Sequence, residues 1–238
     1  MSTESLLRRF YSGDKYNGTL QFYAWLRQHM TPSASVLNIG AGPATREVVR
    51  TIKGEARLAV GIDIDPCVLD NPEFDKVALI ENDRFPVGDA EFDLAFSDYV
   101  LEHVERPEKF LAEVCRVLKP GGSFLFRTPN LYHYVALVSS ATPHWVHDRV
   151  ANKARRLSSE AHAPYPTFYR LNTRAAIRSA ARASGLEAAE LRMVEYEPSY
   201  LKFSSIAFLA GTAYERTVNS SQAFSGLRAN IQGRLIKG

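Results

Sequence analysis

Short apolar runs and an amphipathic segment alternate along the first 130 residues. Five apolar runs have the length of buried strands: 35–39, 58–62, 76–80, 92–96 and 123–127. Apolar residues from Phe110 to Leu118 recur at three- and four-residue spacing, which predicts a helix over 107–118 with one buried stripe. Pro107 suits the first helical position. The alternation predicts βαβ units and an α/β fold with a parallel sheet.

Weaker patterns predict the remaining elements. Helices are expected at 44–53, within 5–30, at 173–184 and at 200–218, and strands at 191–196 and 230–237. Asn172 suits the N-cap of the helix at 173–184, and Gly185 suits its end. Residues 131–172 break the alternation with three prolines and four histidines, so we expect an inserted helical or loop segment there. The expected organisation is one domain over 1–238, with an N-terminal helical region (1–32), a core (33–130), the insert, and a C-terminal part (173–238).

Composition narrows the class of protein only slightly. A chain of 238 residues with a formal net charge of +3 fits one globular domain and does not predict a nucleic-acid partner. The N-terminus lacks the apolar stretch of a signal peptide, and no apolar run has the length of a transmembrane helix. The two cysteines form no CxxC pair, so a disulfide framework is not expected. We expect a cytoplasmic protein.

The strongest motif follows the first predicted strand. The chain passes from Val36-Leu-Asn-Ile39 into Gly40-Ala-Gly42, and glycines allow a tight turn and close approach of a ligand to the backbone. Ordinary strand-to-helix turns also use glycine. Asp63, which closes the second strand about 20 residues later, lies where nucleotide-binding folds place an acid for ribose hydroxyls. The third glycine of a dinucleotide fingerprint is absent.

An ordered set of motifs resembles a known family. The set comprises Gly40-Ala-Gly42, Val60-Gly-Ile-Asp63, Phe85-Pro-Val-Gly-Asp-Ala-Glu-Phe-Asp93, Leu101-Glu-His-Val104 and Arg116-Val-Leu-Lys-Pro-Gly-Gly122. Together they resemble the small-molecule class I methyltransferases, a group that includes the ubiquinone-biosynthesis methyltransferases, over about residues 33–130. The resemblance implies a Rossmann-like fold, a mostly parallel seven-stranded sheet with helices on both faces, and S-adenosylmethionine as cofactor.

The resemblance also implies which residues contact the cofactor. They are Gly40, Ala41, Gly42, Asp63, Ile64, Asn82, Asp83 and Ser97. The glycine loop is expected against the methionine part, Asp63 at the ribose hydroxyls and Ile64 against the adenine. The polar partner of the adenine amine is Asn82 or Asp83, which the sequence does not separate. Ser97 is expected beside the methionyl group.

The acceptor side is less explicit in the sequence. His103 follows the fourth strand, where ligands of open α/β sheets bind, and a histidine suits the role of general base. The alternative is that His103 only packs the short segment before Pro107. Tyr132 and His133 begin the insert next to the fifth strand, and we expect them to face the acceptor unless they simply pack the insert. The histidines of the insert lack metal-ligand spacing, so no metal site is predicted.

The predicted function is methyl transfer from S-adenosylmethionine to a small-molecule, glycan or lipid-linked acceptor, with a hydroxyl oxygen favoured because His103 can serve as its base. The first rival is a nicotinamide-dependent oxidoreductase, disfavoured by the missing third glycine. The second rival is a catalytically inactive methyltransferase-like binding subunit, disfavoured by intact Gly40, Gly42 and Asp63. The sequence leaves the methylated atom, the acceptor and the oligomeric state open.

Overall fold

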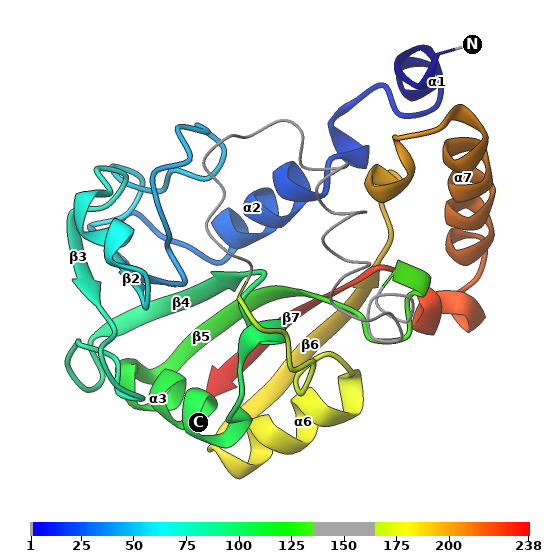
Figure 1. Cartoon of the computed structure of the whole chain (residues 1–238). Coiled ribbons are helices and arrows are strands. Elements are labelled where there is room, and N and C mark those ends of the chain that lie inside the picture. Colours follow the sequence, from blue (N-terminus) through cyan, green and yellow to red (C-terminus); the bar gives the residue numbers. More distant parts are fainter. Residues whose placement is uncertain (1, 136–164) are drawn as a thin grey trace.

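The sheet that the sequence predicts forms the centre of the molecule. The computed structural model describes residues 2–135 and 165–238. Its strands are β1 (Ser35–Ile39), β2 (Leu58–Asp63), β3 (Lys76–Leu79), β4 (Phe92–Asp98), β5 (Leu118–Pro129), β6 (Leu186–Val194) and β7 (Asn230–Lys237). They form one seven-stranded sheet in the order β3-β2-β1-β4-β5-β7-β6 (Figure 1).

The direction of the strands confirms the predicted fold class. The pairs β1–β2, β1–β4, β2–β3 and β4–β5 are parallel, and β7 runs antiparallel to β5 and β6. Chain order reverses between β1 and β4, which lie side by side in the middle of the sheet. In open α/β sheets, ligands bind beyond the carboxyl ends of the strands at such a reversal.

Helices cover both faces of the sheet. They are α1 (Thr3–Phe10), α2 (Gly18–Gln28), α3 (Pro107–Val117), α6 (Arg174–Ala183) and α7 (Ser205–Asn219). The larger apolar core packs α3 and α6 against one face, and the smaller core packs α2 against the other (Figure 1). Helices α1 and α7 meet through Leu6, Tyr11 and Phe208. The helix predicted at 107–118 is confirmed, and the strand that follows it begins earlier than predicted because residues 119–122 form an irregularity within β5.

The helix predicted at 44–53 is wrong. These residues form turns and irregular backbone, and Arg46 adopts a left-handed φ of 56°. The segment is rich in β-branched valine, threonine and isoleucine, which disfavour a short helix. The Arg27 guanidinium also donates to the carbonyls of Val49 and Thr51, at 3.0 Å each, and so binds acceptors that a helix would use. The glycine loop therefore leads into no helix, and a helix N-terminus is not available there for an anion.

The two ends of the insert meet at its base. The Leu131 N–H donates to the Asn172 carbonyl at 2.9 Å. The prediction that Asn172 is the N-cap of α6 is wrong. Its side-chain amide instead donates to Thr128 Oγ1 and to the Pro129 carbonyl, at 2.8 Å each. Thr173 is the cap, and its hydroxyl accepts from Ala176 N. The insert is thus fastened to the carboxyl end of β5.

Elements near the C-terminus differ from the prediction mainly in their bounds. The strand predicted at 191–196 begins at Leu186, and the helix predicted at 200–218 begins at Ser205. The strand predicted at 230–237 is confirmed.

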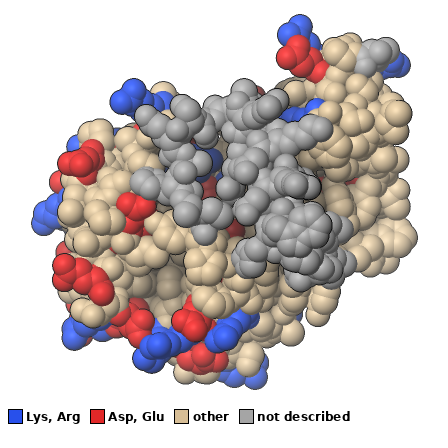
Figure 2. Space-filling model, in the orientation of Figure 1, with Lys and Arg blue, Asp and Glu red and all other residues tan. Residues whose placement is uncertain are grey.

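Within 2–135 and 165–238, no helix has both the length and the apolar character to cross a membrane. Acidic and basic side chains lie interspersed along the edge of the face drawn in Figure 2.

Candidate active site

A cavity lies beyond the carboxyl ends of the four strands β1 to β4. Its volume is about 410 Å³, within the range of small-molecule sites. Residues that follow each of these strands line it, including Gly40, Asp63, Asn82 and Tyr99. The cavity therefore lies at the reversal of strand order, where the fold predicts a ligand.

Gly40, the first residue of the glycine loop, lines this cavity. Gly40 has a φ of 82°, and a Cβ at this position would collide with the side chain of Val100. Gly42 has a φ of 57° and open space where its Cβ would be. Both positions favour glycine because other residues rarely adopt such a backbone. The space beside Gly42 allows a ligand to approach the backbone closely.

Asp63 is held with its carboxylate at the cavity. One oxygen accepts from Gly42 N at 2.7 Å and the other from Asp65 N at 2.9 Å. A carboxylate offers about four lone-pair positions, so each oxygen retains capacity for another donor. Two ribose hydroxyls fit this arrangement. The Gly42 bond also ties β2 to the glycine loop, a second role that the sequence did not predict.

The side of the cavity formed by residues after β2 and β3 combines apolar side chains with one amide. Ile64, Ile80 and Phe85 line it together with Asn82 and Asp83. The Asp83 carboxylate accepts from Arg106 Nη1 at 2.8 Å and from Lys109 Nζ at 3.1 Å, and these cations lower its pKa. Asn82 lines the same wall, and its side chain has none of these charged partners. An amide carbonyl there suits the adenine amine.

Some predicted cofactor residues do not line the cavity. Ala41 and Gly42 lie in the loop beneath it, and Ser97 lies within β4. Ser97 is fully buried, and its hydroxyl has no hydrogen-bond partner among the described residues. Its expected place beside the methionyl group therefore stays a prediction.

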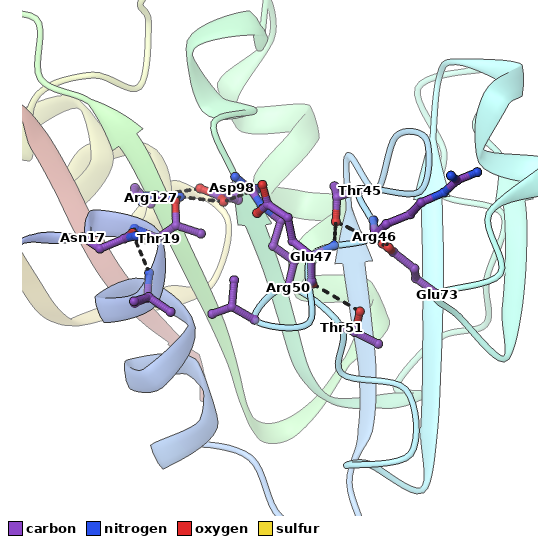
Figure 3. A network of polar contacts seen from close by, with 12 residues as sticks. Asn17, Thr19, Thr45, Arg46, Glu47, Arg50, Thr51, Glu73, Asp98 and Arg127 are labelled. Atoms are coloured by element: carbon purple, nitrogen blue, oxygen red, sulfur yellow. Dashed lines mark hydrogen bonds and ion pairs between the residues drawn. The ribbon is translucent and has the colours of Figure 1, made fainter. Parts of the chain in front are cut away.

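An ion-pair network is centred on Asp98, which lines the cavity. Arg127 Nε and Nη2 each donate to one oxygen of Asp98 at 2.7 Å, and Arg50 Nη1 donates to the same carboxylate at 3.1 Å (Figure 3). Arg127 also reaches Thr19 Oγ1 at the start of α2. The network joins β4, β5, α2 and the loop that replaces the predicted helix. Sequence analysis did not identify it, because its members are separated along the chain.

Tyr99 is a cavity residue that the sequence also did not reveal. It follows β4 directly and has a φ of 59°, which is unfavourable for a tyrosine. The Arg127 guanidinium lies 4.6 Å from the ring centre, and the Tyr99 hydroxyl donates to Asn230 Oδ1 at 3.1 Å. These contacts hold the residue in its strained backbone, a condition that clusters at functional sites.

His103 lies in the same cavity as Asp63. It ends a short 3-10 helix, Leu101–His103, and its Nδ1 lies 2.9 Å from the Pro166 carbonyl. A carbonyl can only accept, so Nδ1 carries the proton at this contact. Nε2 of the neutral ring is then a hydrogen-bond acceptor. Its neighbour Glu102 is buried, which raises the pKa of that carboxyl to about 7.

The insert residues predicted to face the acceptor are not brought to the cavity. Tyr132 is exposed, and His133 is buried against the rings of Tyr134 and Tyr214. His133 Nε2 lies 3.5 Å from Glu195, and burial lowers the pKa of the imidazole to about 4. This environment favours the packing alternative for His133.

No group of three or more metal-ligating side chains is gathered in the parts of the chain before 136 and after 164. Three histidines of the insert, His144, His147 and His162, and the aromatic Trp145 lie outside the described residues.

Part of the chain matches a known protein family. Residues 37–126 match the Methyltransferase domain family. This matched segment lies within the part of the chain whose motifs resemble the class I S-adenosylmethionine-dependent methyltransferases. A malonyl-[acyl-carrier protein] O-methyltransferase of Methylococcus capsulatus is 30% identical over 112 residues, 44% of this chain and 41% of that protein. A ubiquinone/menaquinone biosynthesis C-methyltransferase of Laribacter hongkongensis is 32% identical over 106 residues, 40% of this chain and 42% of that protein.

Solved methyltransferase structures share the fold along nearly the whole chain. A geranyl diphosphate C-methyltransferase of Streptomyces coelicolor, solved with Mg²⁺, geranyl diphosphate and S-adenosyl-L-homocysteine, superposes with a TM-score of 0.57. It is 13% identical and covers 99% of this chain and 82% of that one. The chain spans less than half the length of the two curated relatives. The cofactor of the methyltransferase domain is S-adenosylmethionine, as the motifs predicted, and the nicotinamide alternative is set aside.

Proposed function

We propose that the chain transfers a methyl group from S-adenosylmethionine to a hydroxyl oxygen of a small-molecule, glycan or lipid-linked acceptor, with His103 as the general base. The observation that carries the proposal is the position of His103. It lines the cavity of Asp63, and its Nδ1–H is bound by a backbone carbonyl, which leaves Nε2 to accept a proton.

The residues of the cavity have distinct roles in this proposal. Asp63 binds the ribose hydroxyls, Asn82 meets the adenine amine, and Ile64 packs on the adenine. When bound, the cofactor supplies a methyl group on a sulfonium, which is an electrophile. His103 Nε2 would accept the proton of the acceptor hydroxyl as that oxygen takes up the methyl group, and the thioether left after transfer would carry no charge.

The geometry also supports a division between cofactor and acceptor. Asp63 and Asn82 follow β2 and β3, whereas His103 and Tyr99 follow β4, so the two groups lie on opposite sides of the β1–β4 boundary. Tyr132 remains a predicted acceptor contact, because it is exposed near the end of β5. Alignment of the two reactants in one cavity is itself a large part of catalysis.

The test is a methyl-transfer survey with isotopically labelled S-adenosylmethionine. Acceptors with hydroxyl, amine and carbon nucleophiles are compared, and the methylated atom is located by mass spectrometry. The proposal predicts labelled ether or ester products. Labelled product on nitrogen or carbon, with none on oxygen, would contradict the hydroxyl assignment. Cofactor binding without transfer to any acceptor would favour the inactive-subunit alternative.

A further inference from the structure

A short segment crosses the cavity beside His103. We refer to residues 165–170 as the strap. The backbone N–H groups of Phe168 and Tyr169 donate to the carbonyl of Glu102, at 2.8 and 3.2 Å. The second half of the strap is thus fastened to the 3-10 helix that ends in His103.

The first half of the strap is fastened to the cofactor side. The Tyr165 hydroxyl donates to Asp65 Oδ2 at 2.9 Å, and Asp65 N donates to Asp63 Oδ1 at 2.9 Å. Tyr165 also lines the cavity. Asp65 therefore links Tyr165 to Asp63, the carboxylate proposed to bind the ribose. Pro166 disfavours the helical region for the residue before it, which limits the backbone conformations open to Tyr165.

The same two strap residues contact the proposed base. Pro166 accepts the hydrogen bond from His103 Nδ1, and the Tyr165 ring meets the imidazole edge to face with centroids 6.1 Å apart. Tyr165 therefore contacts both Asp65 and His103, and Pro166 contacts His103. Elements that follow β2 and β4 are joined across the cavity by two consecutive residues.

We propose that Tyr165 is a positioning residue whose bond to Asp65 closes the strap over the bound cofactor and holds His103 in register with it. The proposal rests on the proposed function, because it takes the cavity as the cofactor site. In this proposal the strap opens when the cofactor exchanges, and the hydrogen bond from Tyr165 to Asp65 joins the strap to the β2 side. Partial burial and the carboxylate of Asp65 raise the pKa of Tyr165 to about 12, so its hydroxyl remains a donor across the neutral range.

The experiment measures release of S-adenosylhomocysteine from the full chain by stopped-flow displacement. Tyr165→Phe keeps the ring and removes the hydroxyl, and we expect release to be about fivefold faster, the size of one lost hydrogen bond. Tyr169→Phe is the matched control. It removes a hydroxyl from the same strap, and that hydroxyl makes no hydrogen bond to any described residue. Its release rate should equal that of the unmodified chain. Melting temperatures without ligand should agree among all three.

A double-mutant cycle assigns the effect to the Asp65 contact. Asp65→Ser retains a capping oxygen for Cys67 N but is too short to reach Tyr165. We expect faster release in this variant and no further increase when Tyr165→Phe is added. Normal binding with unchanged release in Tyr165→Phe would overturn the role of the strap and leave the proposed function intact. Failure of the unmodified chain to bind S-adenosylhomocysteine would instead contradict the proposed function and the strap together.

Discussion

Two regions at the same edge of the sheet each combine an acid and a histidine, and they differ in almost every property. Asp63 and His103 line a cavity. The side chains of Glu195, just after β6, and His133 are both buried, and His133 Nε2 lies 3.5 Å from Glu195 Oε2. Glu195 accepts from Ala229 N at 2.7 Å and has Glu215 and Arg228 as charged neighbours.

The difference lies in what surrounds each pair. Burial, reinforced by Glu215, raises the pKa of Glu195 to about 8, and burial lowers that of His133 to about 4. Both groups therefore favour their neutral forms at neutral pH. Asp63 is held by backbone N–H groups beside open space, which suits an ionised carboxylate that receives a ligand. Residue type and strand-end position alone do not distinguish a ligand site from a packed polar cluster.

The largest expected effect separates the two histidines. His103→Ala should lower turnover about 100-fold, the lower end of general-base contributions, with unchanged affinity for S-adenosylhomocysteine. His133→Ala is the matched change in the buried region and should lower the melting temperature, because it leaves a cavity among Tyr134 and Tyr214. Turnover and thermal melting of both variants test the comparison. An equal fall in melting temperature in the His103→Ala and His133→Ala variants would contradict the distinction between a cavity histidine and a packed one.

The next effect concerns the cofactor acid. Asp63→Ala should weaken S-adenosylhomocysteine binding at least about tenfold, because charge-assisted bonds to the ribose are lost. The variant should also lose about 1 kcal/mol of unfolding free energy, since the carboxylate holds Gly42 N and Asp65 N. Calorimetry and denaturant melting measure the two quantities. Unchanged affinity in a folded variant would show that the nucleotide lies elsewhere.

Much of this site was predictable from motifs that are contiguous in the sequence. The glycine loop and Asp63 stand at strand ends that short apolar runs define, so their meeting at one edge follows from the parallel sheet. Tyr165, Tyr99 and the Asp98–Arg127 pair were missed, because their roles depend on contacts between distant segments. The only signal for Tyr165 was its place between two prolines in a stretch assigned to the insert.

The sequence pattern also predicted most strands and one helix of the fold, but it misplaced another helix. Strands bounded by turns were placed within a few residues, and the helix at 107–118 was confirmed. The helix at 44–53 is not formed, because side chains from outside it bind its backbone: Arg27 donates to two of its carbonyls, and Glu73 accepts from Arg46 N. Tertiary contacts of this kind leave no periodic pattern in the sequence.

A smaller effect tests the buried acid through pH. An unfolded glutamate releases its proton near pH 4.3, whereas folded Glu195 retains it up to about pH 8. Stability from this group is therefore complete at low pH and falls as the pH rises between these values. Glu195→Gln keeps an acceptor for Ala229 N and should gain at least about 1 kcal/mol relative to the unmodified chain between pH 5 and pH 7. Parallel pH profiles of unfolding free energy would contradict a protonated Glu195.

The smallest expected effect resolves the two candidates for the adenine amine. Asn82→Ala should weaken S-adenosylhomocysteine binding about threefold, the loss of one neutral hydrogen bond in a partly open site. Asp83→Ala, whose carboxylate already binds Arg106 and Lys109, should leave affinity nearly unchanged. Calorimetry of the two variants decides between them, and the reverse order of effects would assign the role to Asp83.

The most direct test of the account is a calorimetric titration of the unmodified chain with S-adenosylhomocysteine and, separately, with NAD. The geometry of Gly40, Asp63 and Asn82 predicts saturable one-site binding of S-adenosylhomocysteine, loss of most of that affinity in Asp63→Ala, and no binding of NAD. Saturable binding of NAD with no heat from S-adenosylhomocysteine would contradict the assignment of the cavity.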